Sequence, residues 1–295
     1  MRVVANGKPY EIEPDTTVAA FVEARGLDPQ FVIVEWNGEA LERARYGHVV
    51  LTDGDRLELV QAVAGGDDRG AWRRERLARS RLYVVTGARA DRGDLPTFLD
   101  AVLGSGADIV QLREKASEAA DLLRWGEVFA DAARRHGALF ILNDRPDVAM
   151  ALGADGVHVG QDDLAPSFVR GLVGPDVLVG LSTHAPSQWR DAAPEADYLC
   201  AGPVYETPTK PGRPAAGLGY VAFAAGAHAA ATRAAGAEDG SPRPWFAIGG
   251  IDPTTLPDVV AAGASRIVVV RAVAEAEDPA AAVRTLLAGL PPLRD

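Results

Sequence analysis

The sequence predicts an α/β protein: a (β/α)8 TIM barrel preceded by a small α+β domain of the β-grasp (ubiquitin-like) type. First, residues 1–66 carry short strand-like runs and Asn-Gly and Asp-Gly turns around one helical segment. Second, from residue 82 near-continuous Val, Ile and Leu runs alternate with helical patterns, which is typical of a parallel sheet covered on both faces. Third, eight such runs follow one another, the number that closes a TIM barrel. The expected domains are 1–66, a basic linker over 67–81, and the barrel over 82–295.

The composition excludes several classes of protein. Apolar residues make up 47% of the 295 residues, so the chain can bury a sizeable core. A net charge of −11 argues against a general nucleic-acid binder, although a local basic pocket remains compatible with it. Cys200 is the single cysteine, which excludes an intramolecular disulfide and a cysteine-cluster metal site. Without a long apolar stretch or a signal-like N-terminus, we expect a soluble cytoplasmic protein with no membrane partner.

Residues 1–66 predict a sheet wrapped on one helix. Two strand-like runs flank Asn6-Gly7, a hairpin signal because both turn positions tolerate positive φ. Thr16 or Thr17 is expected to cap the helix that follows. Further strands are expected within 31–41 and 48–63. The predicted order is β-β-α-β-β.

The segment 67–81 differs in character from both neighbours. Its sequence, DDRGAWRRERLARSR, has six arginines among three acidic residues. Such a charge run is typical of a solvated helix, so a linker helix is predicted, and a nucleic-acid contact is the alternative.

The runs predicted to form the barrel strands are LYVVT, DIVQL, LFIL, GVHVG, VLVGLS, DYLCAG, WFAIGG and RIVVV. A doubly wound open sheet is the alternative, but the count of eight without a clear switch point favours the barrel. In such barrels the active site is built from residues at the carboxyl ends of the strands. The polar residues that follow each run are therefore the candidates for chemistry.

The second run ends in QLREK, where Gln111, Arg113 and Lys115 alternate. On an extended segment these side chains point to one side. Two cations and an amide at one place suit a pyrophosphate. A surface salt-bridge cluster with Glu114 is the alternative.

The third and fourth runs end in carboxylates. Asn143 and Asp144 follow the third run, and taken alone they favour helix capping ahead of Pro146. Asp163 follows the fourth run, and carboxylates at two adjacent strand ends would form a hard oxygen site of the kind Mg²⁺ prefers. His158 is expected to pack or hydrogen-bond within its strand, because the few dispersed histidines do not support a transition-metal site.

The fifth and sixth runs lead into further polar residues. Ser182 and His184 lack a G-x-S-x-G turn and an evident orienting acid, so hydrogen bonding to substrate is expected rather than nucleophilic attack. Thr207, Thr209 and Lys210 lie in a Pro- and Gly-rich loop whose length indicates a lid. Lys210 would bring a third cation to the same mouth.

The seventh and eighth runs end in AIGGI and VVVRAV. Gly249-Gly250 allows backbone N–H groups to approach a ligand closely. Loops after these two strands are the usual phosphate site of the barrel fold.

Taken together, the motifs resemble those of thiamine phosphate synthases. QLREK, LNDR, GVHVGQDD, GLSTH, GPVYETPTK and AIGGI occur in the order of that family, and the resemblance covers residues 82 to about 290. Residues 1–66 resemble the thiamine-biosynthesis sulfur carriers through the β-grasp pattern, NGE, DGD and a terminal Gly65-Gly66. The resemblance implies that hydroxymethylpyrimidine pyrophosphate is joined to thiazole phosphate, and that pyrophosphate leaves largely before the thiazole nitrogen attacks.

The resemblance also implies roles for the motif residues. Mg²⁺ as cofactor would be held by Asp144 and Asp163. The departing pyrophosphate would be neutralised by cations and stabilised by a hydroxyl: Arg113, Lys115, Lys210 and Ser182. Pyrophosphate or pyrimidine would be bound by Gln111 and Asn143. The thiazole phosphate would be held by two hydroxyls and three backbone amides: Thr207, Thr209, Gly250, Val270 and Arg271. Arg271 is a departure, because many relatives have a small residue such as serine there.

Gly65-Gly66 raises a further question, because a sulfur carrier works through a free carboxylate on its last glycine and an internal peptide bond offers none. Cleavage after Gly66 is the first interpretation. A vestigial or docking module, or a domain that recruits the thiazole-synthesis and carrier-activating enzymes, are the others. Two rival functions remain for the whole chain: a carrier or interaction protein with an inactive barrel, and a barrel like that of a thiazole tautomerase.

Overall fold

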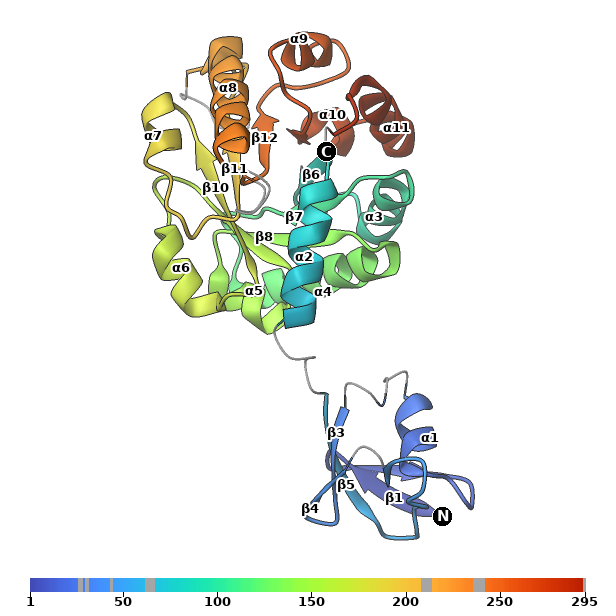
Figure 1. The fold of residues 1–295 in the computed structure, drawn as a ribbon. Coiled ribbons are helices and arrows are strands. Elements are labelled where there is room, and N and C mark those ends of the chain that lie inside the picture. The colour runs from blue at the N-terminus through green and yellow to red at the C-terminus, as the bar shows by residue number, and fades with distance from the viewer. Residues whose placement is uncertain are drawn as a thin grey trace. The chain divides into compact units, whose positions relative to one another are not determined.

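The computed structural model describes residues 1–25, 29, 32–42, 45–61, 67–207, 214–235 and 242–293. The chain divides into two compact units, Met1–Arg69 and Gly70–Asp295 (Figure 1). Within the described residues, no helix combines the length and the apolar character needed to cross a lipid bilayer.

The first unit is a mixed five-stranded sheet in the order β2-β1-β5-β3-β4 with helix α1. Its elements are β1 Arg2–Ala5, β2 Lys8–Glu11, α1 Val18–Glu23, β3 Val32–Trp36, β4 Glu39–Leu41 and β5 Arg56–Gln61. The predicted hairpin at Asn6-Gly7 is present, with φ of 48° and 73° at the two turn residues. Thr17 caps α1, its hydroxyl accepting from the Ala20 amide at 3.2 Å.

This arrangement confirms the β-grasp prediction and adds one strand to it. The turn at Asn37-Gly38 folds the chain back as β4, a short strand paired antiparallel with β3. Parallel pairing of β1 with β5 brings the first and last strands of the unit together. Val18, Phe21 and Val22 of α1 are buried in the core of the unit.

The second unit is a closed parallel barrel in the order β10-β11-β12-β13-β6-β7-β8-β9. Its strands are β6 Leu82–Thr86, β7 Ile109–Leu112, β8 Leu139–Asn143, β9 Gly156–Val159, β10 Leu178–Thr183, β11 Tyr198–Ala201, β12 Trp245–Ile248 and β13 Ile267–Val269. Each strand overlaps one of the eight apolar runs, so the TIM-barrel prediction is confirmed and the open sheet is excluded.

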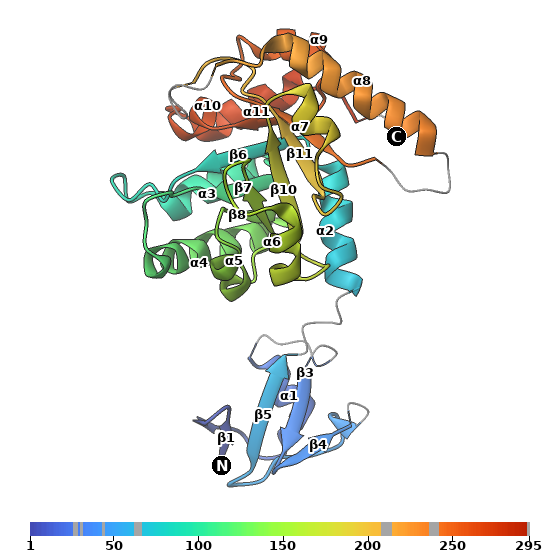
Figure 2. The same cartoon turned by 90° about the vertical axis from the view of Figure 1, so that its left-hand side faces the viewer.

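Helices follow the strands and form the outer layer (Figures 1 and 2). They are α3 Leu95–Gly104, α4 Ala119–His136, α5 Pro146–Leu152, α6 Pro166–Val173, α7 Pro186–Arg190, α8 Gly217–Ala235, α9 Leu256–Ala261, α10 Arg271–Ala274 and α11 Pro279–Gly289. Strand side chains alternate between the two layers of the core. On β6, Leu82 and Val84 belong to the cluster under the helices, whereas Tyr83 and Val85 belong to the cluster inside the barrel.

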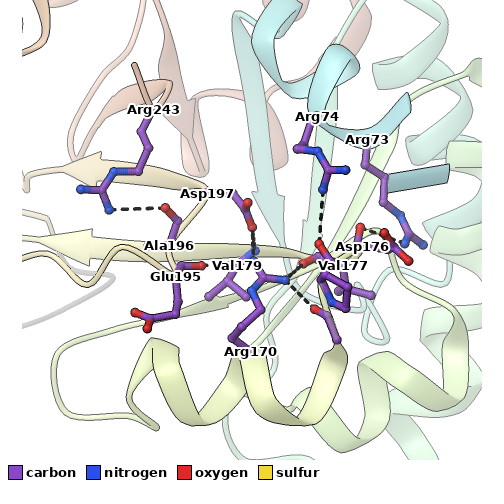
Figure 3. Close-up of polar contacts among 12 residues, drawn as sticks. Arg73, Arg74, Arg170, Asp176, Val177, Val179, Glu195, Ala196, Asp197 and Arg243 are labelled. Carbon is purple, nitrogen blue, oxygen red and sulfur yellow. Dashed lines mark hydrogen bonds and ion pairs between the residues drawn. The ribbon is translucent and has the colours of Figure 1, made fainter. Parts of the chain in front are cut away.

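Helix α2, Asp67–Arg79, differs from the expected solvated linker because its residues from Gly70 onward belong to the barrel unit. Leu77 is 2% exposed and packs in the cluster inside the barrel. Arg73 is 5% exposed and its Nε lies 3.0 Å from Asp155 Oδ1. Its Nη1 donates to the Asp176 carbonyl (Figure 3). Its Nη2 donates to the Ala154 carbonyl. These partners precede β9 and β10, so α2 covers the N-terminal end of the barrel.

Replacement of Arg73 by alanine is expected to destabilise the barrel by about 3–5 kcal/mol, because it leaves the buried Asp155 carboxylate without its cation. Urea denaturation of the full chain measures this difference. Arg74→Ala is the matched control, since the Arg74 side chain is exposed and donates to the Pro175 carbonyl at 3.3 Å. Equal stability losses in the two variants would contradict a structural role for the Arg73–Asp155 pair.

Candidate active site

A cavity of about 360 Å³ lies at the carboxyl ends of the barrel strands. Its lining includes eight of the residues to which the resemblance assigns a role: Gln111, Arg113, Asn143, Ser182, Thr207, Gly250, Val270 and Arg271. They come from the ends of β7, β8, β10, β12 and β13 and from the loop after β11. Barrel closure therefore brings groups from widely separated parts of the sequence to one mouth.

Lys115, Asp144 and Asp163 form a charged cluster after β7, β8 and β9. Lys115 Nζ lies 2.9 Å from Asp144 Oδ2 and 3.8 Å from Asp163 Oδ1. Asp163 Oδ2 also accepts from the Gly160 amide at 2.8 Å, which fixes its position relative to the end of β9. The lysine and the two carboxylates are thus held together by contacts among three consecutive strand ends.

Asp144 occupies a conformation that few residues other than glycine adopt. Its φ is 64°, and its amide donates to the His158 carbonyl at 2.9 Å. Asn143 and Asp144 do not cap α5, because Arg145 is the N-cap residue and no side-chain capping bond is present. The capping interpretation of these two residues is therefore wrong. A left-handed residue held by its neighbours is a feature that clusters at functional sites.

The two carboxylates are electrostatically coupled. Burial raises the pKa of Asp144 above its usual value, and the charge of Asp163 acts in the same direction, whereas the hydrogen bond from Lys115 opposes both. Because the pKa of Asp144 is raised overall, the ionised carboxylate at this position costs folding free energy. A cation placed between the carboxylates would offset that cost.

The cluster has the chemistry of a magnesium site. Mg²⁺ is usually bound through one or two protein carboxylates, with water and substrate phosphate oxygens completing its shell. Among the residues that the structure describes, no group of three or more His, Cys, Asp or Glu side chains could hold a metal ion. A pair of carboxylates suits an ion that shares its ligands with a phosphorylated substrate, and not a closed structural metal site.

The opposite side of the mouth is built from backbone. Gly249 and Gly250 have φ of 106° and 68°. A Cβ on Gly249 would lie 2.5 Å from Pro203 Cα, and one on Gly250 would lie 2.7 Å from Tyr205 Cβ. Both positions therefore require glycine, and the chain after β12 packs directly on the loop after β11.

Val270 and Arg271 complete this side of the cavity. Val270 is the N-cap residue of α10, and Arg271 is the first residue of that helix. Arg271 is exposed and also lines the cavity. Amide groups at a helix start favour phosphate oxygens.

The two polar residues at the end of β10, Ser182 and Thr183, have different environments. Ser182 Oγ lies 2.9 Å from His158 Nε2. Thr183 is buried and is used structurally, since it donates to the Cys200 carbonyl and accepts from Tyr220. His158 Nδ1 meets the Tyr198 hydroxyl at 3.2 Å. This geometry gives no support to a Ser-His-Asp triad and agrees with the expectation that His158 is a hydrogen-bonding strand residue.

Sequence reasoning missed Tyr83 and Tyr198, which lie inside the barrel beneath the cavity. Both are fully buried, and their hydroxyls are 3.2 Å apart. The available signal was a tyrosine at an inward position of an otherwise apolar strand. Glu114, which entered only the alternative of a surface salt-bridge cluster, accepts from the Ala88 amide at 2.8 Å. Thr209, Lys210 and Gly65-Gly66 lie outside the described residues.

Comparison with known proteins gives a consistent result for both units. The family model described as thiamine monophosphate synthase matches residues 82–273, and the ThiS family model matches residues 3–66. A thiamine-phosphate synthase from Acidothermus cellulolyticus is 54% identical over 216 residues, covering 72% of this chain and 96% of that protein. One from Mycobacterium bovis is 50% identical over 225 residues, covering 73% and 96%. A solved structure, the thiamine phosphate pyrophosphorylase from Pyrococcus furiosus, is 28% identical with a TM-score of 0.61, covering 73% of this chain and 96% of that one.

Proposed function

The chain belongs to the thiamine-phosphate synthase family of transferases and carries an N-terminal ThiS-family domain, and we propose how its own residues perform the reaction. The barrel joins hydroxymethylpyrimidine pyrophosphate to thiazole phosphate. The pyrimidine CH₂–O bond breaks, its electron pair leaves with pyrophosphate, and the thiazole nitrogen forms the new C–N bond. The observation that carries this proposal is the cluster of Lys115, Asp144 and Asp163 at the strand ends that also form the cavity.

The departing diphosphate gains negative charge as the bond breaks. Arg113 lines the cavity, and Lys115 lies at the end of the same strand. Cations already fixed beside the leaving group stabilise the transition state more than the ground state, which lowers the barrier. Ser182 donates a hydrogen bond to the same group. No protein nucleophile is needed for this step.

Asp144 and Asp163 would hold Mg²⁺, which when bound neutralises charge on the diphosphate oxygens. Lys115 bridges the two carboxylates and keeps them in place. Gln111 and Asn143 orient the pyrimidine or its diphosphate from the cavity wall.

The thiazole phosphate occupies the backbone side of the mouth. The amides of Gly250, Val270 and Arg271 bind its oxygens, and Thr207 adds a hydroxyl. All four residues line the cavity. The steric requirement for glycine at position 250 supports this role, because a side chain there would collide with Tyr205.

The proposal is tested by incubating the full chain with both substrates and Mg²⁺ and measuring thiamine phosphate and pyrophosphate together. Equal amounts of the two products are expected, and neither forms when one substrate is omitted. A carrier with an inactive barrel would form neither product. A thiazole-tautomerase-like barrel would convert its own substrate without releasing pyrophosphate.

Lys210→Ala is expected to lower kcat by about 10²–10³, as loss of one preorganised contact to a developing charge does. The thermal midpoint should change little. Lys210 belongs to the segment that the structure does not describe, so this role rests on the GPVYETPTK motif. An unchanged kcat under saturating substrates would exclude Lys210 from the reaction.

For the ThiS-family domain we propose that cleavage after Gly66 frees a glycine carboxylate that can be activated and loaded with sulfur. Thiazole-synthesis and carrier-activating enzymes would then be its partners. The order of elements supports this division, because β5 ends at Gln61 and α2 begins at Asp67. Intact-mass spectrometry of the protein from its own cells tests this proposal. Two fragments are expected, one ending at Gly66 and the other beginning at Asp67. Detection of the full-length mass alone would refute processing.

A further inference from the structure

Five polar side chains inside the barrel form a continuous hydrogen-bonded chain beneath the cavity. Gln111 Nε2 donates to the Tyr83 hydroxyl. The Tyr83 and Tyr198 hydroxyls are 3.2 Å apart, Tyr198 meets His158 Nδ1 at 3.2 Å, and His158 Nε2 lies 2.9 Å from Ser182 Oγ. The five residues are at most 7% exposed, so their polar groups need protein partners, and each finds one in this series.

One arrangement of protons satisfies every group when the hydrogen bonds are followed from Gln111. An amide nitrogen only donates, so the Tyr83 oxygen accepts from Gln111. Either hydroxyl can donate across the Tyr83–Tyr198 contact; in the arrangement with Tyr83 as donor, the proton of Tyr198 is left for His158 Nδ1. Burial raises the pKa of both tyrosines well above the usual value, which keeps these protons in place.

This arrangement sets the tautomer of His158 at the other end of the hydrogen-bonded chain. His158 accepts at Nδ1, so the neutral ring carries its proton on Nε2 and donates it to Ser182 Oγ. The hydroxyl proton of Ser182 is then not used toward His158, and it can be donated to a ligand in the cavity that Ser182 lines. The opposite tautomer would take the Ser182 proton and leave that hydroxyl as an acceptor, which an anionic diphosphate would repel.

We propose that Tyr198 is a positioning residue: through His158 it makes Ser182 a hydrogen-bond donor to the departing diphosphate. This inference rests on the proposed role of Ser182 in the reaction. It assigns a function to a buried tyrosine that touches neither substrate, and it explains why a barrel interior contains a chain of polar groups.

Tyr198→Phe tests the proposal, because it removes one hydroxyl and keeps the ring that packs on Tyr83 and Phe246. We expect kcat for pyrophosphate release to fall about tenfold, as loss of a hydrogen bond to a charged group does. The KM for thiazole phosphate should stay within about twofold. Tyr220→Phe is the matched control. It removes another buried tyrosine hydroxyl, which donates to Thr183 at 2.7 Å and takes no part in the hydrogen bonds from Gln111 to Ser182.

Two further measurements separate positioning from a loss of packing. Side-chain ¹⁵N NMR of histidine-labelled protein should show His158 with its proton on Nε2 in the wild type and in Tyr220→Phe, and a mixture of tautomers in Tyr198→Phe. The His158 signals are identified by their absence in His158→Gln. In a Ser182→Ala background, Tyr198→Phe should change kcat by less than about twofold, because the two residues act through one hydrogen bond.

An unchanged His158 tautomer in Tyr198→Phe would overturn the proposal. So would an equal fall in kcat with and without Ser182. If the wild type releases no pyrophosphate, the proposed function fails, whereas the nitrogen signals still test the hydrogen-bonded chain.

Discussion

Arg113→Met is expected to lower kcat for thiamine phosphate formation by about 10²–10³, the size of effect seen when one preorganised donor to a developing negative charge is lost. Arg113 follows β7, is partly buried and lines the cavity. Within the part of the chain that the structure describes, its guanidinium has no hydrogen-bond or ion-pair partner. The side chain therefore contributes little to the fold, and its charge is available to a substrate.

The same variant should keep its thermal midpoint within a few degrees of the wild type. Arg92→Met is the control, because Arg92 is an exposed arginine in the loop after β6 and does not line the cavity. Steady-state kinetics and thermal denaturation of both variants decide the matter. A kcat for Arg113→Met that equals that of Arg92→Met would remove Arg113 from the mechanism.

Asp144→Asn is expected to reduce Mg²⁺-dependent activity by about 10²-fold while raising the thermal midpoint of the metal-free protein. Activity falls because one of the two carboxylates proposed to bind the metal is lost. Stability rises because the pKa of Asp144 is raised, so the folded chain holds the ionised group less well than water does. This loss of folding stability is absent when the pH is below the usual pKa of an aspartate. It is fully present once the pH exceeds the raised pKa of Asp144 in the folded protein. Asparagine also tolerates the left-handed backbone at this position.

Thermal denaturation with EDTA and then with added Mg²⁺ separates the two effects. The wild type should gain stability from Mg²⁺, because a ligand that binds only the folded state stabilises it, and Asp144→Asn should not. Asp147→Asn is the control, since Asp147 is exposed and pairs with Arg145. An equal response of Asp144→Asn and wild type to Mg²⁺ would place the metal elsewhere.

The barrel could be predicted from sequence because its strands are local patterns. Every run from LYVVT to RIVVV forms a strand, and their carboxyl ends carry the polar residues that line the cavity. The meeting of Lys115 with Asp144 and Asp163 follows from the same reasoning, since neighbouring parallel strands end at one rim. The distances and the left-handed backbone of Asp144 depend on packing across the rim, which local patterns do not contain.

Two features could not be predicted from the sequence and became visible only in the folded barrel. The docking of α2 was hidden by its charge, although Arg73 and Leu77 are four residues apart and so share one helix face. The series of hydrogen bonds that runs from Gln111 to Ser182 joins five different strands through their inward side chains. Such long-range contacts exist only after the barrel closes, so a buried tyrosine looks the same in sequence whether it fills space or orients a histidine.

The central claim is that fixed cations and a divalent ion meet at one rim to hold a departing diphosphate. Isothermal titration of the full chain with inorganic pyrophosphate, with and without Mg²⁺, tests it most directly. We expect binding that requires Mg²⁺ and that weakens at least tenfold in Arg113→Met and in Asp144→Asn. Binding of equal strength without the metal, or in either variant, would contradict the account.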